Sequence, residues 1–210
     1  MKPYPHIDTI WKRDERTHRI IEDDWTCPEF EYLRDNIWHF TEKVDGTNIR
    51  VMYDGQQVTF GGRSDNAQIP VPLTTMLWRT LHDTAKWREV WLEDSIAVCL
   101  YGEGYGEGIQ KSGSFYKHDG VDFAVFDVWI SGWWLERHNV EDVASKLGLQ
   151  VVPIIGQGTL LDAAKMARAG FQSRWGNFAA EGIVARPQVD LFNRKGERII
   201  AKIKRRDFAK

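Results

Sequence analysis

The stretch TEKVDGTNIRV, residues 41–51, carries residue types that a nucleophilic site needs. Lys43 lies two residues before the turn-forming pair Asp45-Gly46 and five residues before Asn48. A tight turn at this pair brings backbone amides and a carboxylate close to the lysine. Lysine is a weak nucleophile while it is protonated, and nearby cations favour its neutral form. The spacing therefore permits a lysine nucleophile, and the common alternative is a surface charge beside a turn.

The C-terminal end of the chain offers such cations. Lys202 and Lys204 alternate in a predicted strand, so both side chains project from one face of a sheet. From Arg186 to Lys210 there are nine basic residues and three acidic ones, although the whole chain has a formal net charge of −2. The net charge argues against a protein that coats nucleic acid indiscriminately. The basic end is predicted to attract phosphates, and the alternative is a solvated basic tail.

Composition limits the class of protein. The chain has 210 residues, of which 42% are hydrophobic, and this is enough for a globular core. There is neither a run of eighteen apolar residues nor a targeting segment, so we expect a cytoplasmic protein without a membrane partner. Cys27 and Cys99 are interpreted as ordinary core thiols, and the six histidines have no metal-ligand spacing.

Short-range patterns predict the elements that must position these residues. Strands are predicted at 49–54 and 56–62, joined by a hairpin turn at Asp54-Gly55, and at 95–103, 121–130, 151–155, 182–187 and 198–204. Helices are predicted at 73–92, from a cap at Asn139 to Leu147, and between Thr159 and Gly170. Helices at irregular intervals among hairpin strands favour an α+β class with largely antiparallel sheets flanked by helices. Without repeats or linkers, residues 1–210 are predicted to form a single domain.

The segment EKVDGTN resembles motif I, KxDG, of the covalent nucleotidyltransferases, which include ATP- and NAD-dependent polynucleotide ligases and mRNA capping enzymes. Five more segments resemble the later motifs of this superfamily in the same order: GGRS at Arg63, LYGEGYG at Glu103, FAVFDVW at Phe126, AEGIVAR at Glu181, and AKIK with Lys202 and Lys204. Each is weak alone, but six in order from residue 42 to 204 are a specific signal. The resemblance covers about residues 36–206 and implies the nucleotidyltransferase fold.

Within the superfamily, the chain is most similar to phage-type RNA ligases that seal nicks, whose motif I is EKxxGTN. DNA ligases and capping enzymes more often have arginine at the position of Asn48, and here arginine occurs two residues later, at Arg50. These relatives continue into an OB or other C-terminal domain, and we expect none in this chain. Capture of the substrate is then expected to rest on the basic C-terminal stretch together with the segment before Thr41, or on an accessory protein.

The resemblance implies a role for each matching residue. Lys43 would attack the α-phosphate of ATP and carry AMP, while Glu181 and Asp45 would bind Mg²⁺ or Mn²⁺. The remaining positions are implied in nucleotide or phosphate binding: Glu42, Asn48, Arg63 at the ribose or a nucleic-acid phosphate, Glu103 at a ribose hydroxyl, Phe126 at the adenine face with Asp127 in support, Lys202 and Lys204. Magnesium prefers oxygen ligands, so one or two carboxylates suffice.

The expected function is an ATP-dependent RNA ligase that joins 5′-phosphate and 3′-hydroxyl ends through lysyl-AMP at Lys43. RNA is expected over DNA as the partner, and a phage-encoded enzyme in a host cytoplasm fits the same resemblance. The alternatives are a small DNA ligase and a nucleic-acid-binding module that retains the fold without turnover. An intact Lys43, Glu181 and Lys202 argue against the binding module.

Overall fold

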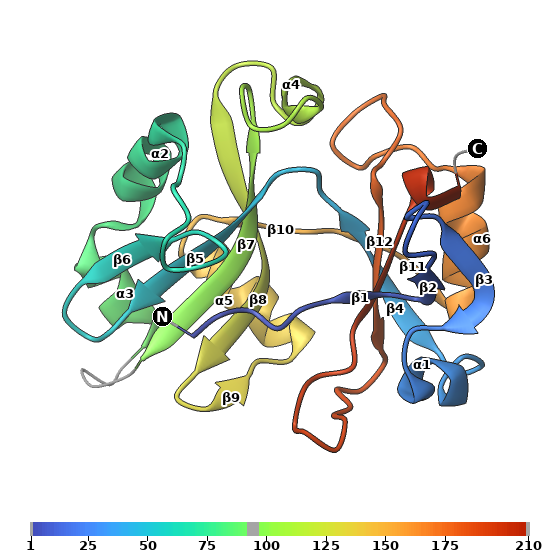
Figure 1. The fold of residues 1–210 in the computed structure, drawn as a ribbon. Coiled ribbons are helices and arrows are strands. Elements are labelled where there is room, and N and C mark those ends of the chain that lie inside the picture. The colour runs from blue at the N-terminus through green and yellow to red at the C-terminus, as the bar shows by residue number, and fades with distance from the viewer. Residues whose placement is uncertain (1, 92–96, 209–210) are drawn as a thin grey trace. The chain divides into compact units, whose positions relative to one another are not determined.

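The computed structural model describes residues 2–91 and 97–208, and these divide into two compact units (Figure 1). Unit 1 consists of the N-terminal residues up to Tyr4 together with Asp45–Val152. Unit 2 consists of Pro5–Val44 and Pro153–Lys210. Each unit has its own sheet and its own hydrophobic core. The mixture of helices with largely antiparallel sheets confirms the predicted α+β class.

Unit 1 is built on a sheet with the strand order β10-β8-β7-β5-β6, in which β9 also pairs with β8. Its strands are β5 (Thr47–Tyr53), β6 (Val58–Gly61), β7 (Val98–Gly106), β8 (Val121–Ile130), β9 (Trp133–Trp134) and β10 (Gln150–Val151). Its helices are α2 (Val71–Leu81), α3 (Thr84–Val90), α4 (Gly113–Tyr116) and α5 (Arg137–Lys146). All these pairs are antiparallel except β10 with β8.

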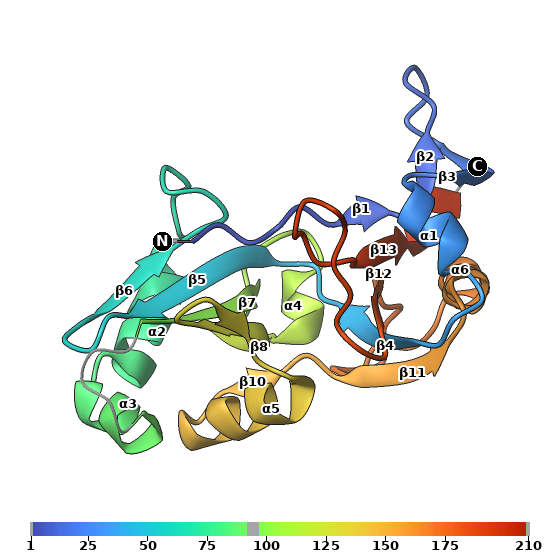
Figure 2. The same cartoon turned by 90° about the horizontal axis from the view of Figure 1, so that it is seen from below.

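The core of unit 1 lies between this sheet and three helices, α2, α3 and α5, which cover one of its faces (Figure 2). Along β5, the alternate residues Ile49, Val51 and Tyr53 are buried in this core. On α2, Leu73, Leu77 and Leu81 recur at helical spacing and are completely buried. Burial of each such leucine contributes about 2 kcal/mol, so this face anchors α2 to the sheet.

Unit 2 is built on a sheet with the order β1-β13-β12-β4-β11 and a separate hairpin of β2 and β3. Its strands are β1 (Asp8–Thr9), β2 (Trp11–Arg13), β3 (Ile20–Trp25), β4 (Trp38–Lys43), β11 (Ile154–Gly158), β12 (Gly182–Pro187) and β13 (Ala201–Lys204). Its helices are α1 (Pro28–Tyr32), α6 (Leu160–Ala169) and the 3-10 helix η1 (Arg205–Phe208).

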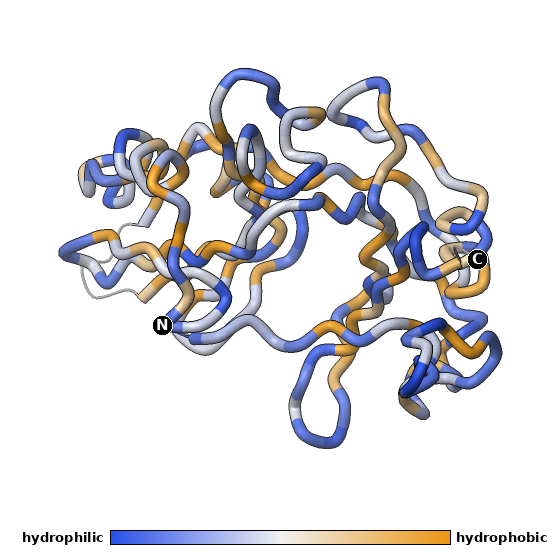
Figure 3. Tube along the Cα trace, turned by 45° about the horizontal axis from the view of Figure 1, so that its top comes forward, coloured by the Kyte–Doolittle hydropathy of each residue, from blue (hydrophilic) through white to orange (hydrophobic). Residues whose placement is uncertain are grey.

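The central strands of unit 2 bury one face and leave the other partly accessible. On β13, Ala201 and Ile203 are completely buried while Lys202 and Lys204 are not. Hydrophobic and hydrophilic stretches alternate along the chain (Figure 3). The face with Ala201 and Ile203 shares a hydrophobic core with Leu160 of α6. This alternation confirms that the two lysines share one face of a sheet.

Several predicted elements are confirmed. The hairpin of β5 and β6 turns at Asp54-Gly55, and β8 and β12 have the predicted bounds. Helix α6 begins after Thr159 in a capping box with Asp162, because each side chain accepts the other residue's backbone N–H. The helix ends at Gly170, whose φ is 74°.

Two helix predictions were wrong in detail. The helix predicted at 73–92 is two helices, because the Asp83 carboxylate accepts the Ala85 N–H and starts α3. The end of this predicted helix, and the start of the strand predicted at 95–103, fall at 92–96 and lie outside the described residues. Helix α5 begins at Arg137 with Glu136 as its N-cap, so Asn139 lies in the first turn and does not cap the helix. Gly148 follows the end of α5 as predicted, with φ 72°.

Two strand predictions were also wrong in detail. The strand predicted at 151–155 is interrupted at Pro153, which has no N–H to donate to a ladder. The residues before it form β10 in unit 1 and those after it form β11 in unit 2. The strand predicted at 198–204 begins only at Ala201, because Arg198 forms an isolated bridge with Phe192 around the turn at Gly196.

Candidate active site

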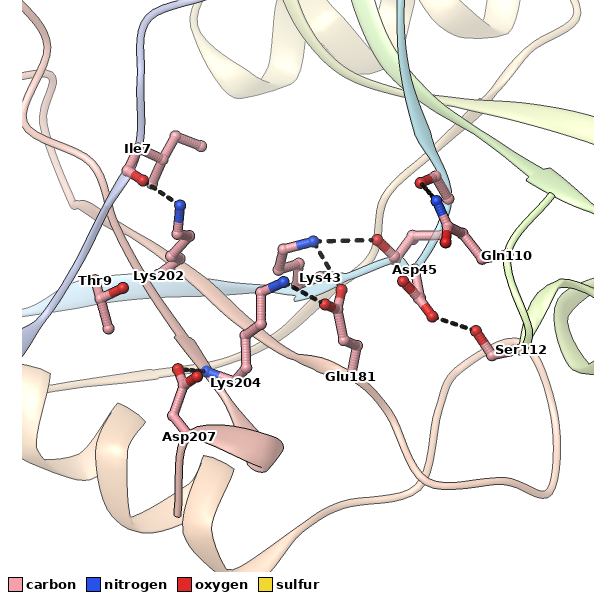
Figure 4. Close-up of polar contacts among 12 residues, drawn as sticks. Ile7, Thr9, Lys43, Asp45, Gln110, Ser112, Glu181, Lys202, Lys204 and Asp207 are labelled. Atoms are coloured by element: carbon pink, nitrogen blue, oxygen red, sulfur yellow. Dashed lines mark hydrogen bonds and ion pairs between the residues drawn. The ribbon is translucent and has the colours of Figure 1, made fainter. Parts of the chain in front are cut away.

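Lys43, Glu181 and Lys204 form a charged cluster on one face of the unit 2 sheet (Figure 4). The Lys43 ammonium lies 2.7 Å from one oxygen of the Glu181 carboxylate, and the Lys204 ammonium lies 2.7 Å from the other. Their side chains are 11% to 21% exposed, so water screens these ion pairs only partly. The single carboxylate balances one of the two positive charges, and an additional anion would balance the other.

Strand register explains how residues so far apart in the sequence meet. Gly182, which follows Glu181, is paired with Lys43 on one side and with Lys204 on the other. A Cβ atom at Gly182 would lie 2.3 Å from the Ile203 carbonyl oxygen and 2.7 Å from the Lys204 Cα. Only glycine permits this close approach of β12 to β13. The glycine therefore sets the spacing of the two lysines across the sheet.

Lys202 lies on the same face, two residues from Lys204 along β13. It is paired in register with Val184 of β12 and with Thr9 of β1. Its ammonium donates a hydrogen bond to the carbonyl oxygen of Ile7 (Figure 4). The structure thus brings Lys43, Glu181, Lys202 and Lys204 onto one sheet face.

Glu42 points to the opposite face from Lys43, as adjacent strand residues do. Its carboxylate is 1% exposed and accepts hydrogen bonds from the Ser173 hydroxyl at 2.6 Å and the Arg174 N–H at 2.8 Å. Burial raises the pKa of the Glu42 carboxyl above its ordinary value, and the two hydrogen bonds oppose this rise. The Glu42 carboxylate thus holds the segment after α6 against β4.

Asp45 and Gly46 belong to unit 1, where α4 and the preceding loop fix their turn (Figure 4). The Asp45 carboxylate accepts a hydrogen bond from the Ser112 hydroxyl, and its N–H donates to the Tyr116 hydroxyl at 3.1 Å. The Gln110 amide donates to the Gly46 carbonyl at 3.2 Å. Three side chains thus hold the chain at Asp45-Gly46, which forms a bend before β5 rather than the hydrogen-bonded tight turn that the DG pair predicted.

Asn48 and Glu103 are directly paired between β5 and β7, so their side chains share the face of the unit 1 sheet opposite α2. The Asn48 side-chain oxygen is buried and has no hydrogen-bond partner within the described part of the chain. A buried acceptor without a donor costs free energy unless a ligand supplies one. This atom therefore fits a hydrogen-bond donor of a bound molecule.

Phe126 and Asp127 lie at an irregularity between β7 and β8, and both contact Tyr4 near the N-terminus. The Tyr4 ring lies 5.0 Å from the Phe126 ring in an edge-on arrangement, and its hydroxyl donates to the Asp127 carboxylate at 2.8 Å. Asp127 is completely buried, whereas Phe126 is partly exposed. The N-terminal Tyr4 thus packs beside the aromatic residue predicted to contact adenine.

Arg63 is exposed in the segment after β6, and the buried Arg50 contacts this segment. Arg50 is 1% exposed and donates to the Gly62 carbonyl at 2.7 Å and to the Asp65 carboxylate at 2.8 Å. The buried guanidinium therefore holds the Gly62 backbone and the Asp65 side chain, one on each side of Arg63.

Glu181 in unit 2 and Asp45 in unit 1 each carry a carboxylate, the kind of oxygen ligand that a hard divalent cation prefers. Among residues 2–91 and 97–208, no three His, Cys, Asp or Glu side chains gather into a metal-binding group. Burial raises the pKa of the Cys27 thiol to about 11 and also raises that of Cys99, which is typical of unreactive buried thiols.

Several supporting residues were not found from the sequence. Ser173 orders the segment that packs against Glu42, Gly182 spaces the two lysines, and Tyr4 packs against Phe126. Only Gly182 could have been found from the sequence, since it lies inside the AEGIVAR segment.

None of the helices in the described ranges has the length and apolar character needed to cross a bilayer.

Solved structures with a similar fold were found. A Naegleria gruberi RNA ligase mutant with AMP and Mn is 19% identical, with a TM-score of 0.64 over 84% of this chain and 52% of that chain. The same ligase with PPi is 19% identical, with a TM-score of 0.64 over 97% of this chain and 62% of that one. This chain thus spans little more than half of the length of these proteins, and the likeness concerns the fold. No match was found among curated protein sequences.

The sequence itself also matches a family model, described as RNA ligase, over residues 36–204. This range contains all six motif-like segments, the charged cluster of unit 2, and the residues Asn48, Glu103 and Phe126 of unit 1. The match spans most of the chain and agrees with the fold of the similar structures. The chain belongs to the RNA ligase family.

Proposed function

We propose that this protein is an ATP-dependent RNA ligase that joins 5′-phosphate and 3′-hydroxyl ends through a covalent lysyl-AMP intermediate at Lys43. The observation that carries the proposal is the cluster in which Lys43 and Lys204 share the Glu181 carboxylate at 2.7 Å each. The cluster combines a nucleophile, a proton acceptor and a second cation, which are the groups that nucleotidyl transfer requires.

In the first step, the Lys43 nitrogen attacks the α-phosphorus of ATP, a P–N bond forms, and the bond to the pyrophosphate oxygen breaks. Lys43 must lose two of its three ammonium protons; the Glu181 oxygen at 2.7 Å is placed to accept one of them, and the other passes to water. Lys204 and Lys202 lie on the same face and would stabilise the negative charge on the α-phosphate.

Unit 1 would bind the nucleoside. The unpartnered Asn48 oxygen would accept a hydrogen bond from the nucleotide, and Glu103, its partner across the sheet, would accept one from a ribose hydroxyl. Phe126 would lie against the adenine, and Arg63 would contact the ribose or a nucleic-acid phosphate. These roles require units 1 and 2 to act as one nucleotidyltransferase domain, which we also propose.

A divalent metal, Mg²⁺ or Mn²⁺, would neutralise phosphate charge when bound. Glu181 and Asp45 would hold it. Once Lys43 carries AMP it is no longer a cation, so the Glu181 oxygen that it contacts loses its ion pair. The carboxylate then retains Lys204 on its other oxygen.

In the later steps, a 5′-phosphate oxygen takes AMP from Lys43, and a 3′-hydroxyl then attacks that phosphate and releases AMP. The substrate would be RNA, in the setting of RNA repair, and the protein would act in the cytoplasm, including a host cytoplasm for a phage-encoded enzyme. The chain itself would capture the strand, and an accessory protein is the alternative if the purified chain does not bind RNA.

The test is incubation with magnesium and ATP labelled at the α-phosphate, followed by denaturing electrophoresis. We expect label on the wild-type band from ATP and none with Lys43→Ala, because no other residue replaces the nucleophile. Lys146→Ala is the matched control, since Lys146 is an exposed lysine of α5 paired only with Asp142 among the described residues. Label on the Lys43→Ala band, or none on the wild type, would contradict the proposal.

A second assay identifies the nucleic acid. Nicked duplexes with either RNA or DNA on the 3′-hydroxyl side are offered to the adenylylated protein. Sealing of the RNA nick at the higher rate is expected, and faster sealing of the DNA nick would identify a DNA ligase.

A further inference from the structure

Unit 2 contains a cavity of about 630 Å³ between the N-terminal segment and the end of the chain. Its walls come from β1, β2, β13 and η1, together with His6 and Thr26. The volume lies within the range of about 300–1,000 Å³ that is typical of ligand sites. Residues 6–26 of this wall precede the region that matches the family model, which begins at residue 36.

The N-terminal wall is packed firmly against the sheet. Strand β1 pairs with β13, with Thr9 opposite Lys202. Trp11 of β2 is 3% exposed, and its ring lies 6.3 Å from that of Phe208 in an edge-on arrangement. A wall held by strand pairing and by buried aromatic residues can keep its charges in place while a ligand binds.

The charge of the lining is strongly positive. Five cationic side chains line the cavity: Lys12, Arg13, Lys202, Lys204 and Arg206. Two carboxylates oppose them, and one of these, Asp207, is already used internally, because it accepts hydrogen bonds from the Arg13 guanidinium at 2.6 Å and the Lys204 N–H at 2.9 Å. The lining therefore retains an excess of positive charge that would favour an anion.

Three donors of this lining are available to a ligand. Arg206 is exposed and forms no ion pair in the part of the chain that the structure describes. Lys12 pairs only with Asp24 at the surface, where both side chains are well exposed, and such pairs contribute about 0–1 kcal/mol. The buried indole N–H of Trp11 has no acceptor among the described residues.

We propose that this cavity binds backbone phosphates of the RNA strand that is to be joined, and that the N-terminal segment thereby forms part of the RNA-binding surface. The proposal rests on the proposed ligase function. Lys204 links the two sites, because it lines the cavity and also contacts Glu181, which contacts Lys43. A strand held here has its phosphates beside the groups that transfer AMP.

The phosphates of ATP offer the same chemistry as those of RNA, and the spread of the cations favours the strand. The cations come from three separate segments, β2, β13 and η1, rather than from one point. This distribution suits successive phosphates along a chain, which make additive and sequence-independent contacts.

The test uses the full chain and a fluorescently labelled single-stranded RNA, without ATP, at several salt concentrations. The double variant Lys12→Ala/Arg206→Ala is compared with the control variant Arg16→Ala/Arg19→Ala. The two control arginines are exposed, lie between β2 and β3, and do not line the cavity. For the cavity variant we expect about tenfold weaker binding and a slope of log affinity against log salt that is smaller by about 1.4, or about 0.7 for each lost phosphate contact. We expect the control variant to bind like the wild type.

A second arm measures the rate of AMP labelling from ATP. Slower labelling of the cavity variant with unchanged RNA binding would assign the cavity to the phosphates of ATP and overturn the proposal. Equal weakening in the control variant, or no weakening in either, would also overturn it. Since RNA binding is measured without ATP, failure of the wild type to label with AMP would count against the ligase function and leave this test intact.

Discussion

The two sheets of this protein place polar groups on their accessible faces in different ways. In unit 2, the face of β4, β12 and β13 gathers the ionic cluster of Lys43, Glu181 and Lys204, spaced by a glycine. In unit 1, the sheet is covered by helices on one face and offers an amide and an aromatic ring on the other, at Asn48 and Phe126. Under the proposed function, unit 2 would supply the charge for phosphoryl transfer and unit 1 would recognise the nucleoside.

The largest effect on stability and on AMP labelling is expected from substitution of Gly182, the glycine between the two lysines. In Gly182→Ala, the new Cβ would meet the backbone of β13 at 2.3 Å, so the strands must move apart. We expect the free energy of unfolding to fall by about 3 kcal/mol and AMP labelling to be lost with the cluster. Urea denaturation and the labelling assay measure the two effects.

Gly156→Ala is the control, because a Cβ there would meet only the Phe40 ring, at an ordinary 3.7 Å, on β11 of the same sheet. If Gly182→Ala labels and unfolds like Gly156→Ala, the close approach of β12 and β13 does not organise the cluster.

A smaller effect is expected from the amide of unit 1. Asn48→Ala removes the unpartnered buried oxygen, so we expect the KM for ATP in AMP labelling to rise about tenfold while the maximal rate changes little. The initial rate of single-turnover labelling at increasing ATP concentration separates the two quantities.

Asn139→Ala, in the exposed first turn of α5, is the matched control and should leave the KM unchanged. A fall in the maximal rate without a change in KM would place Asn48 with the reacting groups and remove the distinction between the two sheets.

The smallest effect concerns the buried Glu42 of unit 2. Burial raises the pKa of this carboxyl in the folded state, so the folded protein retains a proton that the unfolded chain releases. This contribution to stability is greatest below the ordinary value of 4.5 and is lost as the pH rises through the raised pKa. Urea denaturation from pH 4.5 upward should show this decline in the wild type and not in Glu42→Gln.

The exposed Glu15 provides the control, since Glu15→Gln should keep the pH dependence of the wild type. A Glu42→Gln protein with the full decline would show that another group releases the proton.

We do not expect the titration of Glu42 to change the rate of AMP labelling. Glu42 faces away from Lys43 and contacts Ser173 and Arg174, so its substitution should change stability more than the rate of AMP labelling. The same labelling assay at pH 7 checks this expectation.

Much of the local structure could be predicted from the sequence because it depends on neighbours in the chain. The hairpin at Asp54-Gly55, the strand 121–130 and the helix from Thr159 to Gly170 follow from turn, alternation and capping signals. The predicted helix over 73–92 was wrong at Asp83, which caps the start of a second helix. Helical spacing of apolar residues continues through such a cap and does not reveal it.

The sequence by itself determined the order of the motif-like segments, the residue types of the site and the single face shared by Lys202 and Lys204, since a strand has a period of two. Only the tertiary structure decided that Glu181 lies between Lys43 and Lys204, because strand pairing across more than a hundred residues sets that contact. The same is true of Tyr4 beside Phe126 and of the cavity that Lys12 and Arg206 line. Such contacts depend on which strands pair and in what register, and that choice is made by the packing of a whole unit.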